Sequence, residues 1–106
     1  MEPGPAEALL HEVARMAASG APADRVTSTV GTAIAGWADE ADMDTATARA
    51  RVEQVWDSVG KDAADLEAAI SDAEGSGGQG LVAAKRSLAA LQAAVAALAA
   101  AHDRLQ

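Results

Sequence analysis

The sequence predicts an all-α protein in which the second half of the chain forms an antiparallel helical hairpin. Alanine accounts for 30 of the 106 residues, and alanine favours helix more strongly than any other residue. No run of alternating β-branched or aromatic residues indicates a strand. Apolar residues instead recur three and four positions apart through most of the chain. A length of 106 residues suits one helical domain that spans 1–106.

Residues 1–41 are expected to form two shorter helices, the first over roughly 5–19. Pro5 suits the first turn of a helix, because its missing N–H has no helical partner at that position. Gly20 and Pro22 then end the helix, since glycine caps helix C-termini and proline cannot continue the hydrogen-bond ladder. The apolar face of this helix consists of Leu9, Leu10, Val13, Met16 and Ala17.

The second helix begins at Pro22 or Ala23 and reaches the acidic stretch 39–44. In that stretch either Asp42 or Asp44 suits the N-cap of a new helix. A continuous helix through the stretch also fits, because it contains no glycine or proline. The apolar face of the second helix consists of Val26, Val30, Ala33, Ile34, Trp37 and Ala41.

The two longest helices are expected over residues 44–74 and 81–105. In each, apolar residues are separated by alternating steps of three and four, which is the spacing of a heptad seam. The segment 75–80 between them holds four glycines in six residues, so it cannot sustain a helix and allows the chain to reverse. The seam residues are Val52, Trp56, Val59, Ala63, Leu66, Ile70 and Ala73 in the first helix, and Leu81, Ala84, Leu88, Leu91, Val95, Leu98, His102 and Leu105 in the second.

Charge is distributed unevenly along the chain. Residues 1–74 carry 15 acids and 5 bases, whereas residues 75–106 carry 1 acid and 3 bases. An antiparallel hairpin therefore places a net-positive helix against a net-negative one. Alanine beside the seams buries little apolar area, so two such helices are marginal on their own. We expect either a four-helix bundle of the whole chain or a hairpin that another subunit completes.

Composition also limits the partners and the location. A net charge of −8 offers no basic surface to phosphates, so neither nucleic acid nor anionic lipid is expected as a partner. The longest uncharged run, 87–101, has 15 residues and is mostly alanine, so no membrane insertion is expected. No positively charged start precedes an apolar stretch, which argues against a cleavable signal peptide. We expect a cytoplasmic protein, or one that is secreted without a cleavable signal.

The sequence offers no set of residues that predicts catalysis, a metal site or a cofactor. It lacks cysteine, and its serines have no nucleophile-elbow context. The two histidines, His11 and His102, would need carboxylates from other helices to hold a metal ion. The segment 75–80 matches the dinucleotide-binding pattern G-x-G-x-x-G, but that pattern requires a preceding strand. We interpret the segment as a helix–helix loop and expect a non-enzymatic protein.

Large apolar side chains are the candidates for contact with another chain. Trp56 fits the seam and is expected in the core. Trp37 lies beside the acidic stretch, where a tryptophan suits either the core or a contact anchor. The candidate interaction residues are Trp37, Trp56, Leu66, Ile70, Leu88, Leu91 and Leu98.

The segment Gly36-Trp37-Ala38-Asp39 places a tryptophan near residue 40, at an expected helix break. With its small size, acidity, lack of cysteine and all-helical pattern, the chain resembles the small helical-hairpin proteins of bacterial type VII secretion, the Trp-x-Gly family. Asp39 stands where that family has glycine, and the chain has no tyrosine for the family's C-terminal export signal. The resemblance implies a secreted or partner-bound helical dimer.

The expected function is that of a helical interaction protein that acts through self-association or a protein partner. One alternative is a type VII secretion substrate or its helical partner. Another is an acidic adaptor that folds on binding, because Leu, Val, Ile and Phe together make up only 18 of 106 residues.

Overall fold

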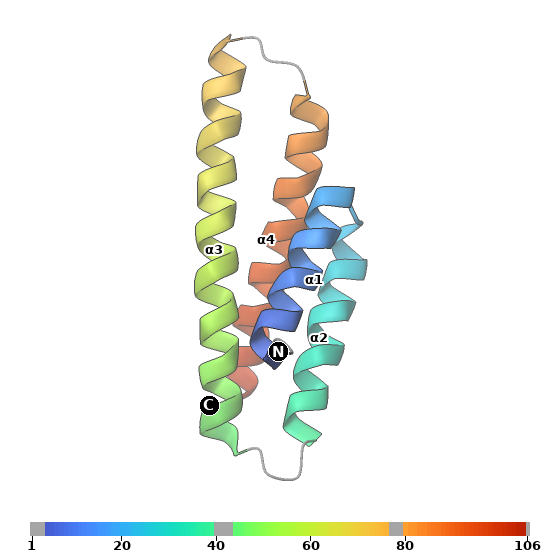
Figure 1. Cartoon of the computed structure of the whole chain (residues 1–106), viewed down its shortest axis with the longest axis vertical. Helices are drawn as coiled ribbons and strands as arrows, with labels where there is room; N and C mark the ends of the chain where they lie inside the picture. Colours follow the sequence, from blue (N-terminus) through green and yellow to red (C-terminus); the bar gives the residue numbers. More distant parts are fainter. Residues whose placement is uncertain (1–3, 40–43, 77–79, 106) are drawn as a thin grey trace.

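The computed structural model describes residues 4–39, 44–76 and 80–105, and these residues form four helices. The helices are α1 (Pro5–Ser19), α2 (Ala23–Asp39), α3 (Thr45–Ser76) and α4 (Leu81–Arg104). Successive helices run in opposite directions, and the described ranges contain no strand (Figure 1). The predicted all-α class and the α3–α4 hairpin are confirmed, and the four helices make a bundle-like fold within one chain.

The turn between α1 and α2 is a glycine-dependent helix cap. Gly20 has a φ of +69°, a left-handed conformation that glycine adopts without a Cβ penalty. Its N–H donates to the carbonyl of Ala17 at 3.1 Å, and the N–H of Ala21 donates to the carbonyl of Met16 at 3.0 Å. These two bonds form a Schellman cap, after which the chain reverses direction.

α2 and α3 are separate helices, so the alternative of one continuous helix is wrong. The carboxylate of Asp44 accepts a hydrogen bond from the backbone N–H of Thr47 at 2.7 Å, which makes Asp44 the N-cap of α3. Hydrogen bonds from the side chain and backbone of Thr47 hold the pKa of Asp44 below its usual range. Asp42, the other predicted cap, and Ala41 of the second apolar face lie outside the described residues.

The two ends of the α3–α4 hairpin are each joined by a polar side-chain pair. Near the loop, Lys85 Nζ lies 2.9 Å from Glu74 Oε1. At the far end, His102 Nε2 lies 2.9 Å from Glu53 Oε1. Both pairs join a carboxylate of α3 to a basic group of α4. This agrees with the prediction that the hairpin places a net-positive helix against a net-negative one. Because the carboxylates are half exposed, these pairs help to fix the register and add little stability.

α4 is the central helix, and it contacts each of the three other helices. Its buried side chains are mostly small: Ala90, Ala94 and Ala101 lie in the core with Leu91 and Leu98. Small side chains let helix axes approach more closely than the usual ~8–10 Å. α4 can therefore pack against three neighbours along one narrow face.

The buried face of α3 is wider than the predicted seam. Val55 lies outside the seam and is only 1% exposed, whereas the seam residue Trp56 is partly buried. A heptad seam describes contact with one neighbouring helix, but α3 contacts α4 as well as α1 and α2. The additional neighbours cover the side of α3 that carries Val55.

By length and composition alone, α4 is apolar enough to cross a membrane, and it is the one such helix in the described residues. The core helix of a soluble protein can meet the same criterion; α4 packs against every other helix of this fold, and 22% of its apolar window is buried. The uncharged run 87–101 is shorter than α4, which spans 24 residues. The absence of membrane insertion stays a prediction.

We expect Ala94→Leu to destabilise the protein by about 1–3 kcal/mol, because Ala94 is 0% exposed and the larger side chain would force the helices apart. Ala96→Leu makes the same change at an exposed position of α4, where an effect within about 0.5 kcal/mol is expected. Urea denaturation followed by circular dichroism measures both. Equal effects of the two substitutions would contradict the packing described for α4.

A second prediction concerns the cap of α3. Because the pKa of Asp44 is lowered in the folded state, its carboxylate stabilises the fold at neutral pH. That stabilisation is lost as the pH falls through the lowered pKa. Asp44→Ala should therefore lower the melting temperature at pH 7, and the difference from wild type should shrink in acid. Thermal melts over a pH series measure this difference. Asp44→Asn keeps a neutral N-cap and should therefore retain more stability than Asp44→Ala. If the difference in melting temperature between wild type and Asp44→Ala did not change with pH, Asp44 would not act as a charged N-cap.

Candidate interaction surface

The seven candidate interaction residues fall into two groups. The first group lies in the core of the chain's own bundle, where a partner cannot reach without a change of fold. The second lies at the margin of the core, where contact with a partner requires no such change. The core group is Trp37, Leu91 and Leu98, and the marginal group is Trp56, Leu66, Leu88 and Ile70, of which Ile70 is buried but lies outside the main core cluster.

Trp37 lies in the last turns of α2, and it is only 6% exposed. The guanidinium of Arg51 lies over its ring, 5.9 Å from the ring centroid, in a cation–π arrangement. This contact joins the end of α2 to the beginning of α3. Of the two roles open to Trp37 from the sequence, its position therefore fits the core.

Trp56 packs against the last turn of α4. Its ring centroid lies 5.5 Å from that of His102, with the two planes inclined by 54°. His102 is hydrogen-bonded through Nε2 to the Glu53 carboxylate, so this imidazole nitrogen carries the donated proton. The three side chains together hold the C-terminal end of α4 against α3.

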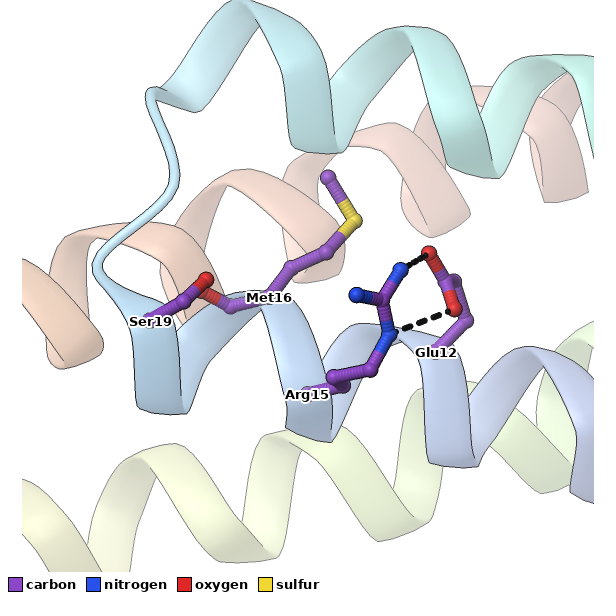
Figure 2. A network of polar contacts seen from close by, with 4 residues as sticks. All are labelled: Glu12, Arg15, Met16 and Ser19. Carbon is purple, nitrogen blue, oxygen red and sulfur yellow. Dashed lines mark hydrogen bonds and ion pairs between the residues drawn. The ribbon is translucent and has the colours of Figure 1, made fainter.

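A local polar network lies on α1 (Figure 2). The guanidinium of Arg15 binds the carboxylate of Glu12 through two nitrogens, with Nε at 3.1 Å from Oε2. This bond lowers the pKa of Glu12 and raises that of Arg15. Ser19 Oγ donates to the carbonyl of Met16 at 3.0 Å. Each bond joins residues three positions apart, so the network supports α1 itself and brings no distant groups together.

The loop end of the hairpin extends past α1 and α2 (Figure 1). Ser87 Oγ donates to the carbonyl of Ala17 at 2.6 Å, and Gly20 lies beside the Arg86 side chain. The α1–α2 turn therefore lies at the level of residues 86–87 of α4. An apolar groove, here named the distal groove, lies between α3 and α4 beyond this level. It is lined by Leu66, Ala69, Ile70, Ala73, Gly80, Leu81 and Ala84.

Along one side of α3, a stripe of residues changes from buried to exposed toward the hairpin loop. Ala48 and Val55 are seven residues apart, and both are 1% exposed. The next two positions at this spacing, Asp62 and Ala69, are exposed. Residues seven apart lie on nearly the same side of a helix. The distal groove, which Ala69 lines, therefore continues the side of α3 that the core covers farther from the loop.

Acidic residues border the distal groove on α3. Asp62 and Asp65 precede Ala69 by seven and four residues, and Asp72 follows it by three, so all three lie on its side of the helix. All three aspartates are exposed. The groove thus combines an apolar floor with a negatively charged border on α3, while Arg86 of α4 lies at the end of the groove next to the α1–α2 turn. The predicted seam contains neither Ala69 nor Asp62, and the change from alanine and valine to aspartate along the stripe is the signal that reveals this border.

Two further features lie elsewhere on the molecule. A second apolar hollow of similar volume lies between α2 and α4, next to the helix backbone at Gly31 and the side chain of Arg104. In residues 4–39, 44–76 and 80–105, no group of three or more histidine, aspartate or glutamate side chains is placed to hold a metal ion. His11 is exposed on α1, whereas His102 is bound to Glu53 on another face of the bundle.

The two tryptophans should differ in their access to solvent. In Trp56→Phe the remaining Trp37 is expected to show weak quenching of its fluorescence by acrylamide, because it is 6% exposed. In Trp37→Phe the remaining Trp56, which is partly buried, should be quenched more strongly. Stern–Volmer plots of the two variants measure the difference. A Trp37 that is quenched as readily as Trp56 would show that α2 does not cover the core as described.

Comparisons with protein-family models, with curated proteins and with solved structures find nothing that matches this chain. The resemblance to the Trp-x-Gly proteins therefore rests on residues 36–39 and on the general character of the sequence, and it stays a prediction. The function has to be argued from the arrangement of the chain's own residues.

Proposed function

We propose that the chain is a helical interaction protein, and that it binds a protein partner at the distal groove. The observation that carries the proposal is the incomplete cover of the hairpin. The stripe of α3 that is buried at Ala48 and Val55 is exposed at Asp62 and Ala69, next to an apolar groove. A concave apolar surface with polar groups beside it is the usual form of a binding site.

The shape of the molecule supports this proposal. The chain measures 52 × 28 × 24 Å, and its radius of gyration of 14.8 Å exceeds the ~13 Å typical of a compact domain of this length. Its accessible surface is 6341 Å², whereas a compact monomer of this mass exposes about 5,500 Å². An elongated chain of this kind exposes more surface to a partner than a compact one.

Circular dichroism separates this proposal from the alternatives that the sequence leaves open. A helical interaction protein with its own core should be fully helical alone and melt cooperatively. An acidic adaptor should show little helix until its partner is added. Secretion of the chain from a type VII-competent bacterium, lost when the secretion ATPase is deleted, would favour the type VII alternative.

The experiment that tests the proposal uses two matched variants. Ala69→Arg places a long cationic side chain in the distal groove, while Ala68→Arg makes the same change one position away on another side of α3. Both alanines are exposed, so both variants should keep the fold and its melting temperature. Sedimentation velocity and affinity capture with mass spectrometry should show associations that wild type and Ala68→Arg share and Ala69→Arg loses. Identical associations for all three proteins would refute the groove as the contact surface.

A further inference from the structure

The distal groove has the form of a site for a helix. Farther from the loop, α1 lies against both α3 and α4 and ends at the level of Ser87. The exposed stripe at Asp62 and Ala69 continues the side of α3 that is covered there. A helix laid along α3 and α4 beyond the α1–α2 turn would therefore cover the groove, as α1 covers part of the hairpin farther from the loop.

The lining of the groove defines the apolar face of this helix. Leu66, Ile70 and Leu81 provide the larger side chains, and the other four lining residues are alanine or glycine. Shallow apolar surfaces of this kind accept leucine and alanine at positions i, i+3, i+4 and i+7 of a partner helix.

The border of the groove defines the charge of this helix. Asp62, Asp65 and Asp72 lie on the groove side of α3, and the whole chain carries a net charge of −8. Lysine or arginine beside the apolar face of the occupant would meet these carboxylates, whereas acidic flanks would be repelled.

A second copy of the chain fits this site poorly. Among the four described helices, α4 alone carries more bases than acids, and it is the central helix that packs against the other three. A second copy therefore has no free cationic helix to place in the groove. Contact through α3 would bring two net-negative helices together.

From these observations we infer that the distal groove binds a cationic amphipathic helix of another protein. The inference rests on the proposed function and adds the chemistry of the partner. The occupant lies between α3 and α4 beyond the α1–α2 turn, with its apolar face on Leu66, Ala69 and Ile70 and its basic flank against Asp62 and Asp65.

Two labelled peptides test the inference. The first, of about 18 residues so that it has some helix in isolation, carries leucine and alanine on one face and lysine on both flanks. The second has the same apolar face with glutamate in place of lysine. Fluorescence anisotropy with the full chain should show at least about tenfold tighter binding of the lysine peptide, and this preference should weaken as salt is added.

Variants of the chain locate the binding. Ala69→Arg should reduce affinity for the lysine peptide at least about tenfold, and Ala68→Arg should leave it unchanged. The double variant Asp62→Asn with Asp65→Asn should weaken binding about threefold to tenfold and reduce its salt dependence. The double variant Asp57→Asn with Glu67→Gln removes the same charge from exposed positions away from the groove lining, and it should bind like wild type.

The outcomes separate this inference from the proposed function. Equal affinity for the two peptides, or binding that Ala69→Arg does not affect, overturns the cationic helix. Self-association of wild type that Ala69→Arg abolishes would identify a second copy as the occupant, which overturns the inference and leaves the proposed function intact. Associations that are the same in Ala69→Arg and wild type would instead overturn the proposed function itself.

Discussion

The fold depends on the close approach of α4 to three other helices. Ala90, Ala94 and Ala101 allow that approach, because a methyl group occupies little space between two helix backbones. Each alanine removes little apolar area from water, but it loses no side-chain entropy when it is buried. Close contact along residues 90–101 of α4 replaces the few large contacts of a leucine-rich core. The same alanines favour the helix locally, so local preference and tertiary packing agree along α4.

The surface that we propose for binding arises where this packing ends. α1 and α2 reach only the level of Ser87, where Ala17 accepts a hydrogen bond from the serine hydroxyl. Beyond that level, α3 and α4 continue without α1 and α2 beside them (Figure 1), and their apolar side chains line the distal groove. The apolar floor of the groove is thus the same kind of surface as the core, and the aspartates beside it keep it compatible with water.

Much of the fold could be predicted from the sequence because its signals are local. Gly20 and Pro22 determine the end of α1, and Asp44 determines the start of α3, through bonds to residues one turn away. The heptad spacing likewise identifies the face on which α3 and α4 meet. The one difference at the hairpin loop, where α3 continues to Ser76 instead of ending at residue 74, reflects the tolerance of a helix end for glycine.

The candidate site could be predicted only in part, because its limits are set by contacts between residues far apart in the sequence. Leu66 and Ile70 are in the predicted seam and line the groove, but Ala69 is not in the seam. Its exposure depends on where the α1–α2 turn meets α4, through a contact between residues 70 positions apart. The burial of Val55 depends on the same packing. A seam read from one helix carries no information about which further helices cover its sides.

The position of the α1–α2 turn also has a consequence for how such a chain can change. α1 and α2 have 15 and 17 residues, whereas α3 has 32. Insertion of one heptad into each short helix would lengthen it by about 10 Å and move the turn toward the loop of the hairpin, beside the distal groove. An open binding surface and a closed, self-sufficient bundle are therefore separated by a simple insertion, which leaves the hairpin itself unaltered. The lengths of α1 and α2 thus determine how much of the α3–α4 hairpin stays uncovered and open to a partner.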